Sequence, residues 1–180
     1  MRSPLRTAIL AGTAVAVAGA VTTVTLNASA AEQTRPIPRP KPSSTPSPID
    51  PPAGLHKLGS YRVVSGTQTY TCTGGVFPAA SVPEARLAGP RGWIHHFKGP
   101  SWQSEKDGSL VTATKVADLP RTGTIPELLL QVNSHTGDGI LSKAAYIQRL
   151  YTSGGVAPAR ACTDGETAAV PYSAVYVFWG

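Results

Sequence analysis

The densest group of residues able to do chemistry lies between residues 92 and 108. Its members are His95, His96, Trp102, Glu105 and Asp107. An imidazole, a carboxylate and an indole in one cleft would suit acid–base chemistry or stacking on a sugar. Neighbours in a strand point to opposite faces, so only one histidine can face such a cleft, and we take it to be His96. The interpretation we favour is structural, with Trp102 in the core and Asp107 in a turn.

Gln148 and Arg149 form a second polar pair. If this segment is a strand, one of the two side chains faces inward. Arg149 either lays its stem over apolar surface with its head in water, or grips a carboxylate or sugar hydroxyls beside Tyr151. The candidate ligand-binding residues are therefore His96, Trp102, Gln148 and Arg149. The candidate catalytic set, should the protein be an enzyme, is His96 with Glu105 or Asp107.

The sequence lacks the short motifs that would name a reaction. It contains no G-x-S-x-G nucleophile elbow, no G-x-x-x-x-G-K phosphate loop and no G-x-G-x-x-G dinucleotide loop. The four histidines show no paired spacing of the kind that binds a metal. We expect no metal and no cofactor, and we lean against an enzyme, although a triad assembled by the fold remains open.

The first thirty residues have the pattern of a signal peptide. Arg2 and Arg6 precede an uncharged stretch over residues 8–26, and the small residues Ala28, Ser29 and Ala30 follow. We expect cleavage after Ala30, secretion, and no stable membrane anchor in the mature protein. The alternative is an uncleaved anchor, because the uncharged stretch is just long enough to span a bilayer.

Residues 31–52 predict a disordered linker. Eight of the residues from Glu32 to Pro52 are proline, which favours an extended chain that buries little apolar surface. The formal net charge is +6, yet the region after the linker shows no basic stripe, so nucleic acid is not an expected partner.

Residues 53–180 predict a single all-β domain. Runs rich in Val, Ile, Thr and aromatic residues alternate with Gly, Asp and Pro turn signals. The runs are residues 61–64, 68–72, 93–97, 110–116, 125–132, 144–152 and 170–179. We expect an antiparallel β-sandwich, with a small β-barrel as the alternative. Residues 144–150 also have fair helix propensity, and the last run is apolar on both faces, which places it inside a sheet.

The chain has two cysteines, Cys72 and Cys162. In an exported protein a lone pair of this kind indicates a disulfide rather than a metal site or a nucleophile. It would join the second predicted strand to the segment before the last one.

A set of motifs resembles a known family. They are Gln68-x-Tyr70-x-Cys72, His96-Phe97-x-Gly99-Pro100-Ser101-Trp102, Asp107-Gly108-Ser109, Ile147-Gln148-Arg149 and Tyr172-x-Ala174-x-Tyr176-x-Phe178. Over nearly all of residues 52–180 the chain is similar to secreted bacterial and fungal domains of unknown function, some labelled malate dehydrogenase. The resemblance implies no activity, and the label conflicts with the missing phosphate-binding βα turn. Ser101 and Glu127 depart from the Thr and Trp common in the family.

Three functions remain as hypotheses. The first is a non-catalytic binding module for cell-wall or extracellular polysaccharide, suggested by the linker and by the Trp- and Tyr-containing domain. The second is a secreted hydrolase that uses His96 with Glu105 or Asp107. The third is a structural or stress-related envelope protein without a small ligand.

Overall fold

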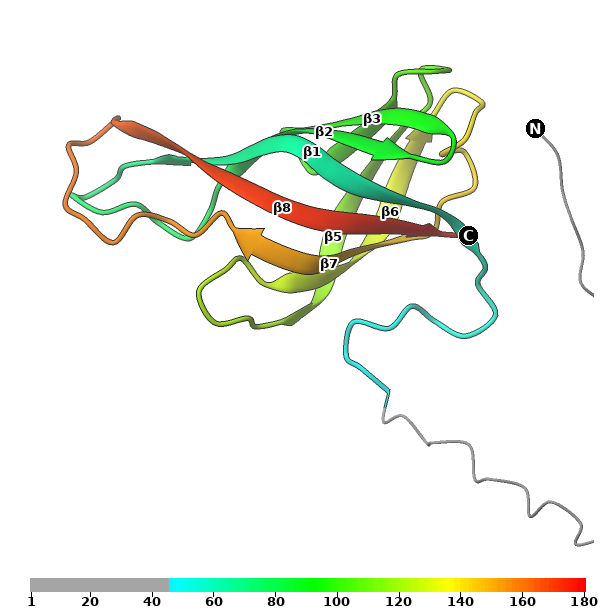
Figure 1. Ribbon diagram of the computed structural model, residues 1–180, viewed down its shortest axis with the longest axis horizontal. Coiled ribbons are helices and arrows are strands. Elements are labelled where there is room, and N and C mark those ends of the chain that lie inside the picture. The colour runs from blue at the N-terminus through cyan, green and yellow to red at the C-terminus, as the bar shows by residue number, and fades with distance from the viewer. Residues whose placement is uncertain (1–45) are drawn as a thin grey trace, which may run out of the picture. The chain divides into compact units, whose positions relative to one another are not determined.

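The computed structural model describes residues 46–180, which form eight strands and no helix (Figure 1). The strands are β1 (Lys57–Thr71), β2 (Val82–Gly89), β3 (Gly92–Phe97), β4 (Ser101–Ser104), β5 (Leu110–Leu119), β6 (Glu127–Thr136), β7 (Tyr146–Gly154) and β8 (Thr167–Trp179). The expected signal peptide and most of the expected linker, residues 1–45, lie outside the described residues. Within the described part of the chain, no helix is available that could cross a membrane.

The strands close into an antiparallel barrel. Each strand pairs with the next in sequence, and β8 pairs with β1. The predicted all-β class is confirmed, the predicted sandwich is wrong, and the small barrel named as the alternative is the observed architecture. Closure gives both β1 and β8 a partner on each side, so neither is left as an exposed sheet edge.

β8 shows why the barrel has a well-filled interior. Its alternate residues Tyr172, Ala174, Tyr176 and Phe178 are buried in the main core, as their shared face predicts. Val177 points the other way and is still only 6% exposed. The expectation that this strand lies inside the sheet is confirmed.

β1 is one long strand where the sequence predicted two. Ser65 and Gly66 read as a turn, but they lie at a bulge where the pairing with β2 and β8 shifts register. A Cβ on Gly66 would lie 2.8 Å from the Cβ of Ala85, so a glycine is needed here for close packing rather than for a chain reversal.

Two strands were missed by sequence analysis, and one ambiguity is resolved. β2 contains Pro, Glu and Ala, which have weak strand propensity, and β4 is only four residues long. Both form because neighbouring strands supply hydrogen-bond partners on each side. The segment from Tyr146 onward is strand β7 rather than a helix.

At one end of the barrel β8 pairs with β1 from Thr167 to Pro171, and this end with its loops projects as an arm (Figure 1). The arm has a small core of its own, formed by Tyr70, Cys72 and Phe77. The predicted disulfide between Cys72 and Cys162 is confirmed.

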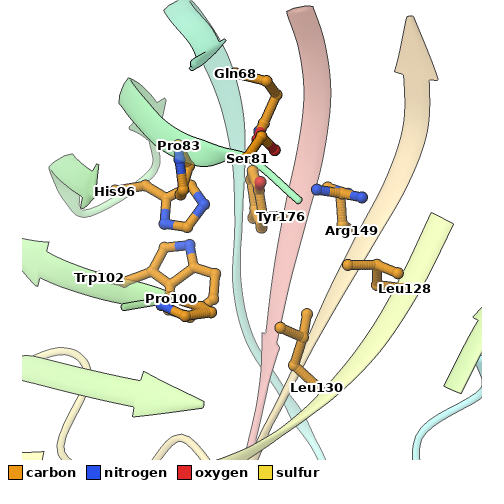
Figure 2. Close-up of a pocket in the computed structure, with 10 residues that line it drawn as sticks. All are labelled: Gln68, Ser81, Pro83, His96, Pro100, Trp102, Leu128, Leu130, Arg149 and Tyr176. Carbon is orange, nitrogen blue, oxygen red and sulfur yellow. The ribbon is translucent and has the colours of Figure 1, made fainter. Parts of the chain in front are cut away.

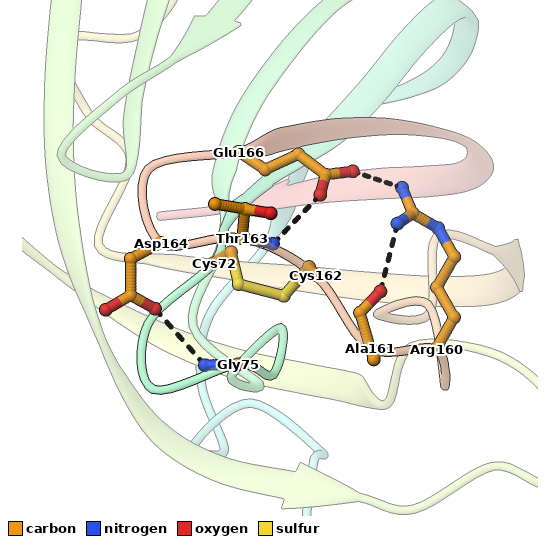
Figure 3. The surroundings of a disulfide bond; sticks show 8 residues. All are labelled: Cys72, Gly75, Arg160, Ala161, Cys162, Thr163, Asp164 and Glu166. Carbon is orange, nitrogen blue, oxygen red and sulfur yellow. Dashed lines mark hydrogen bonds and ion pairs between the residues drawn. A yellow bond between two sulfur atoms is a disulfide. The ribbon is translucent and has the colours of Figure 1, made fainter.

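Polar contacts tie the loops around the disulfide together (Figure 3). A carboxylate oxygen of Asp164 accepts a hydrogen bond from the backbone N–H of Gly75 at 3.2 Å. Arg160 pairs with Glu166, whose other oxygen accepts from the backbone N–H of Thr163. These contacts hold the two sides of the arm at the point where the cysteines meet.

The last residues of the expected linker pack on the outside of the barrel. Ile49 is 3% exposed, and its carbonyl oxygen accepts a hydrogen bond from Gln148 Nε2 at 2.6 Å. Register pairing places Gln148 between Leu129 and Val177 in one outward-facing row, and all three are buried. Ordered packing therefore begins before residue 53, where we placed the start of the domain.

This contact predicts a measurable contribution from the segment. Ile49→Ala in the full chain is expected to lower the free energy of unfolding by about 2 kcal/mol, because the lost methyl groups are buried against the barrel exterior. Urea unfolding measures this value. Val64→Ala, at a side chain that is 60% exposed, is the control and should change little. Equal losses for both variants would show that Ile49 is not docked in solution.

Candidate functional site

A cavity of about 130 Å³ lies inside the barrel (Figure 2). Every strand except β5 contributes to its lining. Its buried walls are Gln68, His96, Trp102, Leu130 and Tyr176. Its outer rim consists of partly or fully exposed residues, namely Ser81, Pro83, Pro100, Leu128 and Arg149. Because the lining changes from buried side chains to exposed ones, the cavity is open to solvent on one side and a small molecule can enter there.

His96 and Trp102 form the aromatic side of the cavity. They are cross-strand partners in the β3–β4 pair, so their side chains share the inner face. The rings stack with centroids 4.3 Å apart and planes 5° from parallel. Tyr176 on β8 meets both rings at an angle, with centroids at 5.1 Å from His96 and 5.8 Å from Trp102.

The protonation state of His96 follows from its contacts. Nδ1 lies 2.9 Å from the carbonyl oxygen of Ser101, which can only accept, so Nδ1 carries the proton and Nε2 keeps a lone pair. Burial lowers the pKa of His96 from 6.5 to about 3; the Ser101 bond opposes this shift and the charge of Arg149 adds to it. At neutral pH the ring is an uncharged hydrogen-bond acceptor.

Two buried donors in the cavity wall have no partner among the described protein groups. They are the indole Nε1 of Trp102 and the amide Nε2 of Gln68. The amide oxygen of Gln68 accepts from the Ser81 hydroxyl at 2.6 Å, which fixes the amide group. The amide also contacts the Tyr172 hydroxyl. Burial raises the pKa of that phenol and this contact acts to lower it, so Trp102 Nε1 is the clearer unpaired donor. Unpaired buried donors cost free energy, typically about 1–3 kcal/mol each, and are rare in folded proteins.

Arg149 is the cationic group of the cavity. Its Nε and Nη2 donate to the carbonyl oxygen of Pro126 at 3.1 and 2.9 Å, which anchors the guanidinium beside the rim. Within residues 46–180 no carboxylate lies close enough to form an ion pair with it. Its charge favours the ionised form of Tyr176, but burial is the larger effect and raises the pKa of that phenol.

Comparison with known proteins identifies the family. The family model described as "Protein of unknown function (DUF3455)" matches residues 90–180, from the turn before β3 to the end of β8. The chain belongs to this family. No curated protein and no solved structure matched the chain. The DUF3455 match includes His96, Trp102 and Arg149, whereas Gln68 and Ser81 come from the residues before it.

Three of the four predicted ligand-binding residues meet at the cavity of this DUF3455 protein. His96, Trp102 and Arg149 all line it. Gln148 does not, because its side chain points outward, where it binds Ile49 and accepts from Trp179 Nε1 at 2.9 Å. Its role is to attach the segment before β1 to the barrel.

The structure does not bring the predicted catalytic acids to His96. Both oxygens of Glu105 accept from Arg86, at 2.7 and 2.6 Å, on the outer surface. Asp107 lies in the β4–β5 turn, where it accepts from the hydroxyl and N–H of Ser109. The Ser109 hydroxyl and the other bonds lower the pKa of Asp107 to about 2. Both acids therefore have structural partners.

Sequence reasoning missed Gln68, Ser81 and Tyr176 as cavity residues. Gln68 is a polar residue at a position that is 3% exposed, but only the closed barrel reveals that burial. Tyr176 lies in the last predicted run, which is apolar on both faces, and it is both core and cavity wall. Residues 46–180 contain no group of three or more His, Cys, Asp or Glu that could hold a metal ion. They also contain no helix to form a dinucleotide-binding βα turn, which removes support for the dehydrogenase label.

Proposed function

We propose that this protein is an exported, non-catalytic binding barrel whose interior cavity holds one compact ligand. The observation that carries the proposal is the unpartnered buried indole N–H of Trp102 in the wall of a cavity with a solvent-facing rim. A ligand acceptor that reaches this N–H would satisfy it, which favours binding beyond the burial of apolar surface.

The cavity size favours a small molecule over a sugar chain. A dry cavity of roughly 150 Å³ holds one benzene molecule, so this cavity suits a ligand of about that size. Trp102 is 1% exposed and stacked on His96, so it is not available as a flat surface platform for a polysaccharide. The binding-module hypothesis stays a prediction, with its ligand narrowed from a polymer to a compact ring.

Other features support parts of the proposal. The Cys72–Cys162 disulfide suits an oxidising compartment, as the signal-peptide pattern predicts. The hydrolase hypothesis loses support, because no Asp or Glu of the described part of the chain lines the cavity and His96 has a low pKa. An envelope protein without a small ligand remains the outcome if no compact molecule binds.

Titration with benzamide, followed by NMR of the indole N–H groups, tests the proposal. The Trp102 resonance is expected to shift as its N–H finds an acceptor. Trp179 is the internal control, because its N–H already donates to Gln148 on the outer face. If no compound in a panel of neutral and charged six-membered rings shifts the Trp102 resonance, the idea of a ring-binding cavity is refuted.

Trp102→Phe separates binding from folding. The change keeps a ring against His96. The smaller ring leaves a void, but the loss of an unpaired donor offsets part of that cost, so stability is expected to fall by at most about 1–2 kcal/mol, compared with about 3–5 kcal/mol for Trp102→Ala. Benzamide affinity is expected to fall about three- to tenfold, the value of one hydrogen bond. Calorimetric titration and urea unfolding measure the two effects. Unchanged affinity would mean that the indole N–H does not contact the ligand.

A further inference from the structure

We infer that the ligand is a small monocarboxylate with a flat apolar body, and that Arg149 pairs with its carboxylate. This inference rests on the proposed function and specifies its ligand class. It follows from the balance of charge in the cavity, from the way Arg149 is held, and from the arrangement of apolar side chains around it.

The cavity carries one uncompensated positive charge. Among the lining residues within 46–180, Arg149 is the single ionised group at neutral pH, since His96 is neutral there and none of them is an acid. A partly buried cation without a counterion is costly, and proteins normally pair such charges. An anion entering the cavity would supply the missing partner, whereas a cation would be repelled.

The guanidinium is fixed but not saturated. Two of its N–H groups donate to the Pro126 carbonyl oxygen. A guanidinium has five N–H donors, and a hydrogen-bonding contact with the Tyr176 hydroxyl engages a further one. The donors that remain at the Nη end are available to the oxygens of a carboxylate. The Pro126 bonds set the orientation in advance, which lowers the entropy cost of binding.

The other side chains fit the body of a flat ring. Figure 2 shows Arg149, Leu128 and Leu130 on one side of the cavity and the stacked His96 and Trp102 on the other. A ring between these walls contacts aliphatic and aromatic carbon while its carboxylate reaches Arg149. The single cation indicates one carboxylate rather than two, and the cavity volume of about 130 Å³ leaves room for one ring.

The test compares benzoate with benzamide, which have nearly the same shape and differ in charge. Binding to the full-length protein is measured by calorimetric titration near neutral pH. Benzoate is expected to bind at least tenfold more tightly, because its carboxylate forms an ion pair with Arg149, whereas the benzamide oxygen accepts from the same cation as a neutral group. Arg149→Gln is expected to abolish this preference, because benzoate affinity falls much further than benzamide affinity.

Two further variants keep the result interpretable. Arg149→Lys retains the charge and should keep a preference for benzoate, which rescues the inference if Arg149→Gln folds poorly. Arg86→Gln removes a cation from the outer surface, where it is paired with Glu105, and should change neither affinity. Equal affinity for the two probes in the wild-type protein would overturn the monocarboxylate inference and leave the proposed function intact. Binding of neither probe would overturn both.

Discussion

Reduction of the Cys72–Cys162 disulfide is expected to lower the free energy of unfolding by about 4–5 kcal/mol. The bond joins residues 90 positions apart, and in the chain-entropy description a loop of that length restricts the unfolded chain by roughly this amount. Because a domain of this size is stable by only about 5–15 kcal/mol, the loss would remove a large part of its stability. The arm should open first, since its own core is small.

Urea unfolding with and without reductant measures the loss, and the double variant Cys72→Ser with Cys162→Ser provides the matched protein without the bond. Reductant has no other cysteine to act on, because the chain contains two. The double variant should therefore unfold at the same urea concentration with or without reductant. A wild-type midpoint that reductant leaves unchanged would show that the bond restricts the unfolded chain far less than its loop length implies.

Acidification is expected to destabilise the fold through His96. Its pKa is about 3 in the folded protein, because burial disfavours the charged ring, and 6.5 is the ordinary value that applies when the chain unfolds. Between these two values the unfolded state binds the extra proton, so stability falls as pH falls. The slope approaches ~1.4 kcal/mol per pH unit, a loss of several kcal/mol across the window.

His96→Gln isolates this contribution, because an amide N–H can still donate to Ser101 but does not titrate. The free energy of unfolding of this variant should lose most of its pH dependence between about pH 6 and pH 5. Hydrogen bonds lower the pKa values of Glu105, Glu166 and Asp107, and these groups add acid sensitivity of their own mainly below about pH 5, so the slopes of the two proteins are compared between about pH 6 and pH 5. His135→Gln, at an exposed histidine, is the control. The same slope in His96→Gln as in the wild type would rule out a neutral buried ring.

Part of the cavity could be predicted from the sequence. The run from His96 to Trp102 contains a Gly99-Pro100 bend, and a hairpin there places the two rings on neighbouring strands. Alternation then requires His95 and His96 to face opposite ways, and the structure has His95 outside, against Glu84 at 2.6 Å, and His96 inside. Which member of the pair Gln148 and Arg149 faces inward could not be read in this way. Ile147 precedes the pair and Leu150 follows it, and both are apolar. The hydrophobic pattern therefore does not indicate which of the two polar side chains points into the barrel.

The sequence by itself determined the all-β class, the pairing of Cys72 with Cys162 and the two apolar faces of β8. These follow from residue type and from a period of two along a strand. Only the tertiary structure decided that the sheet closes into a barrel, that Glu105 and Asp107 lie away from His96, and that Arg149 lines the cavity without an acidic partner. The physical reason is that alternation fixes which residues share a face of one strand. It does not fix which strands pair, and long-range hydrogen bonds between β1 and β8 settle that choice.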